Sequence, residues 1–214
     1  MEEEIKFGVE EDSLYQLLNP NVCEYQKPGE PFTVEETNET GKAVVTIYTK
    51  RPGFVVRCLD DKGNIRTLPF FNQTWKGVTT TCADHLLFLF DKKSGAWALH
   101  VFELKRSPDS KKWEHILEQF NGAMVRAYAI AGVLRIAEFV GVYLHCGYRK
   151  DKSNLISNKQ IGLKSKRPKE PPPESFLRQE IKLFSYPNLS PKNEPIQLSD
   201  TNGTAVFRPD IQSG

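Results

Sequence analysis

The most regular hydrophobic pattern in the chain lies between residues 82 and 105. Two apolar runs, 85–90 and 98–104, flank a polar segment over 91–95. That segment, Asp-Lys-Lys-Ser-Gly, has the composition of a turn. The pattern predicts a β-hairpin, with both strands half-buried or fully buried.

Charged residues stand at the open end of this hairpin. Because side chains alternate between the two faces of a strand, Glu103 and Lys105 share one face. A turn centred between residues 93 and 94 pairs positions that sum to 187, which sets Asp84 opposite Glu103. Two acids in such a pair repel each other unless a positive charge lies between them. Lys105 and a divalent metal ion are both candidates for that charge.

The apolar periodicity after residue 105 predicts a helix followed by a strand. Apolar residues recur at steps of three and four over 109–134, as on one face of a helix: Trp113, Ile116, Leu117, Phe120, Met124, Ala127, Tyr128 and Ala131. Residues 138–146 form the next apolar run and are predicted to be a strand. The order of hairpin, helix and strand predicts an α/β crossover.

The hydrophobic pattern of the N-terminal third is less regular. A short helix is predicted over 8–18, a loop over 20–40 and a strand over 41–50. The runs 53–60 and 64–71 are expected to pair as an extra N-terminal hairpin, and 72–81 links them to the central one. Trp75 in that link is a candidate for stacking on a nucleic-acid base, although a Trp that covers the core is an alternative.

The composition changes near residue 149. Residues 149–169 hold eight Lys or Arg against one acid, and prolines follow. We therefore expect one domain over 1–148 and a basic, Pro-rich linker with a loosely ordered tail over 149–214. Residues 1–40 carry two basic and eleven acidic residues (2 − 11 = −9), whereas the remainder carries 27 and 16 (27 − 16 = +11). A basic body suits a polyanionic partner, and the acidic segment is a candidate surface for a protein partner.

The four cysteines, at positions 23, 58, 82 and 146, are widely spaced and include no CxxC pair. They are therefore expected to be reduced thiols, with Cys82 packing in the core. No apolar run reaches the length needed to span a membrane, and no secretory signal is seen. A cytoplasmic location is expected.

An acid on one strand, Glu-x-Lys on the next and a helix thereafter resemble the PD-(D/E)xK, or restriction-endonuclease-like, nuclease superfamily. The resemblance covers about residues 80–145 and departs from the motif in having Ala83 where a Pro precedes the acid. It implies an α/β fold with a central mixed β-sheet and flanking helices. It also implies that Asp84, Glu103 and the carbonyl of Leu104 bind Mg²⁺ or Mn²⁺, and that Lys105 positions the attacking water.

The same resemblance extends to the helix. Lys112, Gln119 and Arg126 lie seven residues apart and form one row on its surface. Gln119 matches the helix residue that lies near the metal in related nucleases, whereas Lys112, Arg126 and Arg106 are candidates for binding phosphate. Alternatively, these three residues form an ordinary solvent-exposed face of the helix. The family often adds an acid before the hairpin, and four candidates for it are Glu10, Glu11, Asp12 and Glu24.

The resemblance thus implies a magnesium-dependent hydrolase that cleaves phosphodiester bonds, in DNA rather than RNA, and a possible homodimer. One alternative is a catalytically inactive nuclease-fold protein that binds nucleic acid or another protein. Another is a phage or mobile-element accessory protein that binds a host protein through its acidic N-terminus.

Overall fold

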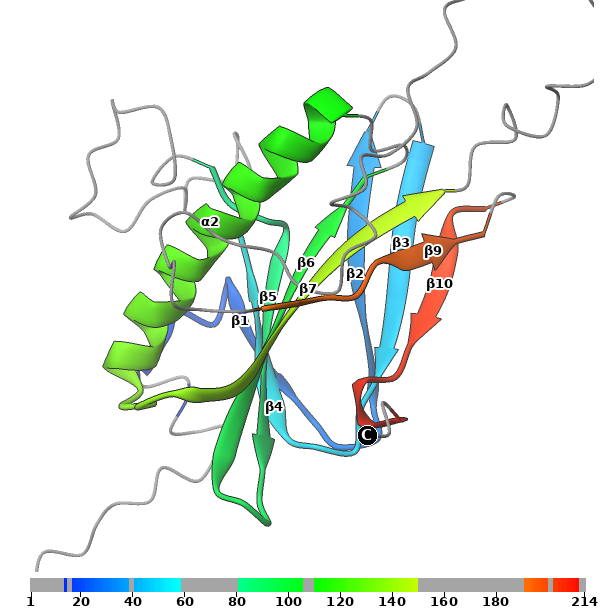
Figure 1. Ribbon diagram of the computed structural model, residues 1–214. Helices are drawn as coiled ribbons and strands as arrows, with labels where there is room; N and C mark the ends of the chain where they lie inside the picture. The colour runs from blue at the N-terminus through cyan, green and yellow to red at the C-terminus, as the bar shows by residue number, and fades with distance from the viewer. Residues whose placement is uncertain are drawn as a thin grey trace, which may run out of the picture.

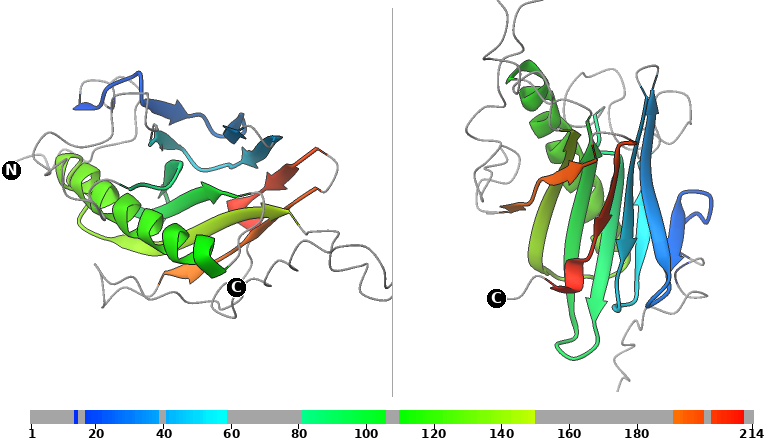
Figure 2. Two further views of the ribbon diagram at one scale, coloured as in Figure 1. Left: turned by 90° about the horizontal axis from the view of Figure 1, so that it is seen from above. Right: turned by 90° about the vertical axis from the view of Figure 1, so that its right-hand side faces the viewer.

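The computed structural model describes residues 14, 17–38, 41–58, 81–105, 110–149, 191–199 and 202–211. Within these ranges the protein is a mixed α/β fold of three layers: one long helix, a large sheet and a smaller sheet. Figure 1 shows the helix crossing one face of the large sheet, and Figure 2 shows the small sheet against the opposite face. The described residues contain one long helix, so they do not show the several flanking helices that the sequence led us to expect.

The large sheet has seven strands in the order β1-β4-β5-β6-β7-β8, with β9 also paired to β7. From β1 to β6 each strand is antiparallel to its neighbour, whereas β7 is parallel to β6, β8 and β9, which makes the sheet mixed as predicted. Their bounds are Cys23–Gln26 (β1), Gly53–Arg57 (β4), His85–Asp91 (β5), Ala96–Leu104 (β6), Phe139–Arg149 (β7), Lys192–Asn193 (β8) and Ile196–Leu198 (β9).

The small sheet has the order β10-β3-β2, with β2 and β3 antiparallel and β10 parallel to β3. Its bounds are Pro31–Asn38 (β2), Gly41–Tyr48 (β3) and Thr204–Phe207 (β10). The first and last parts of the described chain therefore meet in one sheet. The strand predicted over 41–50 is confirmed as β3.

The central hairpin is confirmed together with its predicted register. His85 pairs with Phe102 and Asp91 with Ala96, so paired positions sum to 187. In the turn, Asp91 Oδ1 accepts a hydrogen bond from the Lys93 amide, and Oδ2 accepts one from the Ser94 hydroxyl. Gly95 closes the turn with a φ of 69°, a conformation that side chains with a Cβ rarely adopt.

The long helix, α2, spans Ser110–Val133 and joins β6 to its parallel neighbour β7. The predicted crossover of strand, helix and strand is therefore confirmed. The apolar stripe of α2 packs on the large sheet together with side chains of β4, β5, β6 and β7. A second apolar cluster fills the space between the two sheets, and it includes Val34 and Val45 from the small sheet with Leu87 and Phe102 from the large one.

Two predictions for the N-terminal third are wrong. Residues 20–40 are not a loop, because they contain β1 and β2. Short strands bounded by prolines and rich in acids lack a strong local signal, and these two are stabilised by the strands they pair with. The predicted pairing of 53–60 with 64–71 is wrong for residues 53–57. These residues form β4, and both edges of β4 are already paired, one with β1 and the other with β5. Residues 59–80 lie outside the described part of the chain.

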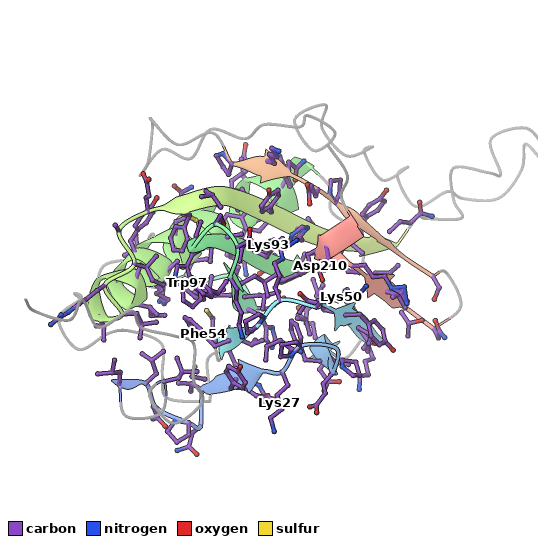
Figure 3. All side chains as sticks on the ribbon, turned by 90° about the horizontal axis from the view of Figure 1, so that it is seen from below. Lys27, Lys50, Phe54, Lys93, Trp97 and Asp210 are labelled. Carbon is purple, nitrogen blue, oxygen red and sulfur yellow. The ribbon has the colours of Figure 1, made fainter. Side chains whose placement is uncertain are left out.

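The prediction of a loosely ordered tail is also wrong for the described residues 191–199 and 202–211. The strands β8 and β9 pair with β7, while β10 pairs with β3, so this segment joins the two sheets. A short 3₁₀ helix, η2 (Pro209–Ile211), follows, and Asp210 accepts hydrogen bonds from the Lys50 amide at 2.5 Å and from Arg51 Nε at 2.7 Å. Figure 3 shows Asp210 beside Lys50.

Among the described residues, no helix combines the length and the apolar character needed to cross a membrane.

Candidate functional site

Asp84 and Glu103 meet at the open end of the central hairpin, as the register requires. Asp84 directly precedes β5, and its Oδ2 accepts a hydrogen bond of 2.7 Å from the Leu104 amide. Glu103 is the next-to-last residue of β6. The side chain of Asp84 is thus fixed against the strand that carries Glu103.

Glu103 is the most unusual residue of the site, because its side chain is 0% exposed. It alternates with Leu99 and Val101, whose side chains belong to the core beneath α2, and it pairs across the sheet with buried Cys146. Its Oε2 atom has no hydrogen-bond partner among the described residues. A buried carboxyl oxygen without a partner is costly, which suggests that the site serves more than packing.

Lys105 lies directly after β6 and contacts two carboxylates. Its Nζ atom is 2.5 Å from Glu103 Oε1 and 3.2 Å from Glu36 Oε1. Glu36 belongs to β2, so this lysine bridges the two sheets at the end of β6. About a fifth of the side chains of Lys105 and Glu36 is exposed (22% and 23%), which leaves the cluster open to solvent at one side.

The electrostatics of this cluster are unbalanced. Burial raises the pKa of Glu103 well above its usual value, Asp84 raises it further, and Lys105 only partly offsets these two effects. Burial alone would lower the pKa of Lys105, but Glu103 and Asp84 raise it above its ordinary value. When Asp84, Glu103, Glu36 and Lys105 are all ionised, they carry −3 + 1 = −2, so a divalent cation would neutralise them.

Sequence reasoning missed Glu36, although a signal for it exists. In β2, Phe32 and Val34 point into the space between the sheets, and Glu36 follows at the same alternation. A charged residue at an inward position of an amphipathic strand needs a partner, and here the partner is Lys105. Because the sequence predicts a loop over 20–40, it gives no strand alternation in which Glu36 would stand out as an inward charge.

The predicted row on α2 lies against the segment that leads into β5. Gln119 Nε2 donates to the Cys82 carbonyl at 3.4 Å, and the Gln119 carbonyl accepts from the Ala83 amide at 3.1 Å. Arg126 is 8% exposed, and its Nη1 donates to the carbonyls of Thr81 and Gly122, both at 2.9 Å. These two residues therefore position the backbone next to Asp84, rather than forming a solvated face.

Other candidates lie apart from the cluster or outside the described residues. Glu24 forms an exposed ion pair of 2.6 Å with Arg57 on β4, the strand next to β1. The positions that the structure does not describe are Glu10, Glu11, Asp12, Trp75 and Arg106, together with the side chain of Lys112.

The donor set fits a hard divalent cation in part. Carboxylate oxygens from Asp84, Glu103 and Glu36 suit Mg²⁺ or Mn²⁺, and the buried Oε2 of Glu103 is an unused donor. Among the described residues, however, no three His, Cys, Asp or Glu side chains converge closely enough to hold a metal by themselves. Mg²⁺ commonly uses only one or two carboxylates and takes its other ligands from water and substrate phosphate.

No protein-family model, curated protein or solved structure matches this chain in comparisons with known proteins. The functional assignment therefore depends on the geometry and charge of the site. The elements that carry it, a hairpin followed by α2 and a parallel β7, are those expected from the sequence.

Proposed function

We propose that the protein is a metal-dependent nuclease that hydrolyses phosphodiester bonds, with DNA as the favoured substrate. The observation that carries this proposal is the cluster of Asp84, Glu103 and Lys105 at the end of the hairpin, where Glu103 is fully buried and Oε2 is unpaired within the described chain. Three carboxyl groups beside one lysine at a partly open site suit a divalent cation, and binding of the cation would favour the ionised form of Glu103.

Each residue has a role that follows from its position. Asp84 and Glu103 would hold Mg²⁺ or Mn²⁺, and the Leu104 carbonyl stays a predicted third ligand. Such an ion, when bound, polarises a phosphoryl oxygen and lowers the pKa of a bound water. Lys105, in contact with Glu103, is placed to orient the attacking water or to neutralise charge that develops on the phosphate. Glu36 would position Lys105 from the small sheet.

The test is cleavage of labelled single- and double-stranded DNA and RNA with Mg²⁺ or Mn²⁺, comparing wild type with Lys105→Ala. Lys92→Ala is the matched control, because Lys92 is exposed in the turn at the other end of the same hairpin. Metal-dependent cleavage should disappear in Lys105→Ala and persist in Lys92→Ala. If folded wild-type protein cleaves none of the four substrates with either metal, the proposal is wrong.

A second candidate is a nuclease-like fold that binds nucleic acid or a protein without catalysis. Two observations favour it: Lys105 is already engaged by two carboxylates, and the described side chains do not complete a metal site. Binding of Mn²⁺, followed by calorimetry, separates the two functions. A catalytic site should bind the ion and lose it in Asp84→Ala, whereas a binding module should show no heat of binding in either protein.

A further inference from the structure

The outer face of the small sheet carries two large exposed side chains. In β3, the buried residues Val45 and Ile47 point toward the large sheet. Thr46 and Tyr48 alternate with them and therefore point outward. Val206 of β10 pairs with Thr46, so it lies on the same face. Tyr48 is 37% exposed and Val206 is 62% exposed, and Figure 2 shows the small sheet as an outer layer of the molecule.

Two cations lie at the end of this face that Tyr48 occupies. Arg208 directly follows β10, is exposed, and has its guanidinium carbon 5.1 Å from the centre of the Tyr48 ring. After β3, Thr49 is buried and Lys50 is exposed, so the alternation of the strand continues by two residues. An aromatic ring and two positive charges thus share one end of the small sheet.

The carboxylates near this face do not cancel these two charges. Each of them has a cation of its own, as an ion pair or in the same loop: Glu35 with Lys42 at 2.6 Å, Asp210 with Arg51 at 2.7 Å, and Glu30 with Lys27 in the loop before β2. Within the described chain, no carboxylate forms an ion pair with Lys50 or Arg208. These eight residues carry 5 − 3 = +2, which suits an anionic partner.

We propose that the outer face of the small sheet is a docking surface for a single strand of nucleic acid. Tyr48 stacks on a base, while Arg208 and Lys50 bind phosphates of the backbone on either side of it. Unpaired bases stack on aromatic rings and on Arg guanidinium planes, and cations beside such a ring follow the backbone. The Tyr48–Arg208 pair offers both kinds of contact in one place.

Other occupants fit this face less well. A stable protein interface takes about 800 Å² from each partner around an apolar centre, whereas the described part of this face exposes only Tyr48 and Val206 as large apolar side chains. The bases of a duplex are already paired and stacked on each other, so they are not free to stack on a tyrosine.

This docking surface is separate from the candidate site at the end of β6. Glu36, which reaches that site, pairs with Ala43, and Tyr48 follows five residues later on β3. At about 3.3 Å per residue, Tyr48 lies about 17 Å along the strand from Ala43. The inference therefore goes beyond the proposed nuclease function and holds whether or not the protein cleaves its partner.

The test is fluorescence anisotropy of short labelled oligo-dT and oligo-U, compared with an oligo-dT·oligo-dA duplex of the same length, titrated with the full-length protein in EDTA. Because EDTA removes divalent metal ions, a failure here leaves the nuclease proposal untouched. We expect the single strands to bind more tightly than the duplex. Tyr48→Ala should weaken single-strand binding by about fivefold or more, whereas Tyr48→Phe, which keeps the ring, should bind as wild type does.

The dependence of binding on salt tests the phosphate contacts. Each phosphate contact on a single strand contributes about 0.7 to the slope of log K against log salt concentration. Arg208→Gln should therefore reduce the slope by about 0.7, and Lys50→Gln/Arg208→Gln by about 1.4. Lys192→Gln is the matched control, because Lys192 also lies over a tyrosine ring, 5.6 Å from the centre of Tyr143, but belongs to β8 of the large sheet. Its slope should equal that of wild type.

Circular dichroism establishes that each variant is folded. The inference is overturned if neither oligonucleotide binds, if the duplex binds as tightly as the single strands, or if folded Tyr48→Ala and Arg208→Gln behave as wild type. It is also overturned if analytical ultracentrifugation shows a dimer that Tyr48→Ala dissociates, since a second copy of the chain would then occupy this face.

Discussion

At the scale of single residues, Glu103 is a buried carboxyl group held between Asp84 and Lys105, and Glu36 reaches the same lysine from the small sheet. The alternation of side chains and the length of the turn set Asp84 opposite Glu103, in agreement with the register of the hairpin. The complete burial of Glu103 and the reach of Glu36 from another sheet depend on tertiary packing. No local pattern around 103–105 contains that information.

Replacement of Glu103 by Gln should stabilise the protein while it removes metal binding. Gln keeps the shape of the side chain but removes a buried charge that Asp84 repels, and Lys105 retains Glu36 as its partner. Because burial and Asp84 both disfavour the charged form of Glu103, the free energy of unfolding at neutral pH should be higher in the variant than in wild type. Urea unfolding and Mn²⁺ calorimetry measure the two effects.

Glu35→Gln is the control for this substitution, because Glu35 precedes Glu36 on β2 but is half exposed and pairs with Lys42 at the surface. Its unfolding free energy should change by less than about 0.5 kcal/mol. A Glu103→Gln variant that is markedly less stable than wild type would show that Glu103 contributes mainly as the partner of Lys105.

At the scale of elements, α2 does more than cover the sheet, since it fixes the segment that leads to Asp84. Arg126→Met keeps the aliphatic stem but removes the bonds from Nη1 to the carbonyls of Thr81 and Gly122. Hydrogen bonds from a charged donor contribute about 1.5–3 kcal/mol each, so the loss of two should lower the free energy of urea unfolding by about 3 kcal/mol or more. Arg57→Met removes an exposed ion pair with Glu24 and should cost less than about 1 kcal/mol. Equal losses in the two variants would contradict this role for Arg126.

The elements also show where prediction from the sequence succeeds. The hairpin, α2 and β7 have long apolar patterns of their own, and their bounds agree with expectation within a few residues. The strands β8, β9 and β10 have only two to four residues each, and their sequences, KN, IQL and TAVF, lack a long apolar run. They are stabilised by pairing with β7 and β3, which lie far away in the sequence.

At the scale of the whole molecule, the C-terminal segment closes the two sheets over a pair of buried histidines. His100 Nδ1 lies 3.0 Å from His145 Nε2, and His145 Nδ1 lies 3.0 Å from the Glu194 carbonyl. A carbonyl only accepts, so His145 donates from Nδ1 and accepts at Nε2 from His100. Phe207 of β10 packs against both rings. The pair therefore connects β6 and β7 to the backbone between β8 and β9 and to β10.

This arrangement requires both imidazoles to be neutral. Burial lowers the pKa of His145 to about 3, although the hydrogen bond to Glu194 opposes it, and burial with His145 nearby lowers the pKa of His100 well below its usual value. The unfolded chain binds protons at the usual pKa of about 6.5, whereas the folded chain does not. Stability is therefore fully present above pH 6.5 and is lost as the pH falls below it.

His100→Phe should reduce this pH dependence. Between pH 6.5 and 5, one neutral buried histidine accounts for about 2 kcal/mol, so the difference in unfolding free energy between wild type and variant should shift by that amount in favour of the variant. Phe keeps the aromatic contact with Tyr143, on which His100 stacks at 4.7 Å. His115→Phe replaces a histidine on α2 that is 55% exposed, and its curve should stay parallel to wild type. If the free energy of unfolding of His100→Phe also changed with pH in parallel with that of wild type, His100 would be protonated in the folded protein. The inference that the two histidines form a neutral pair would then be wrong.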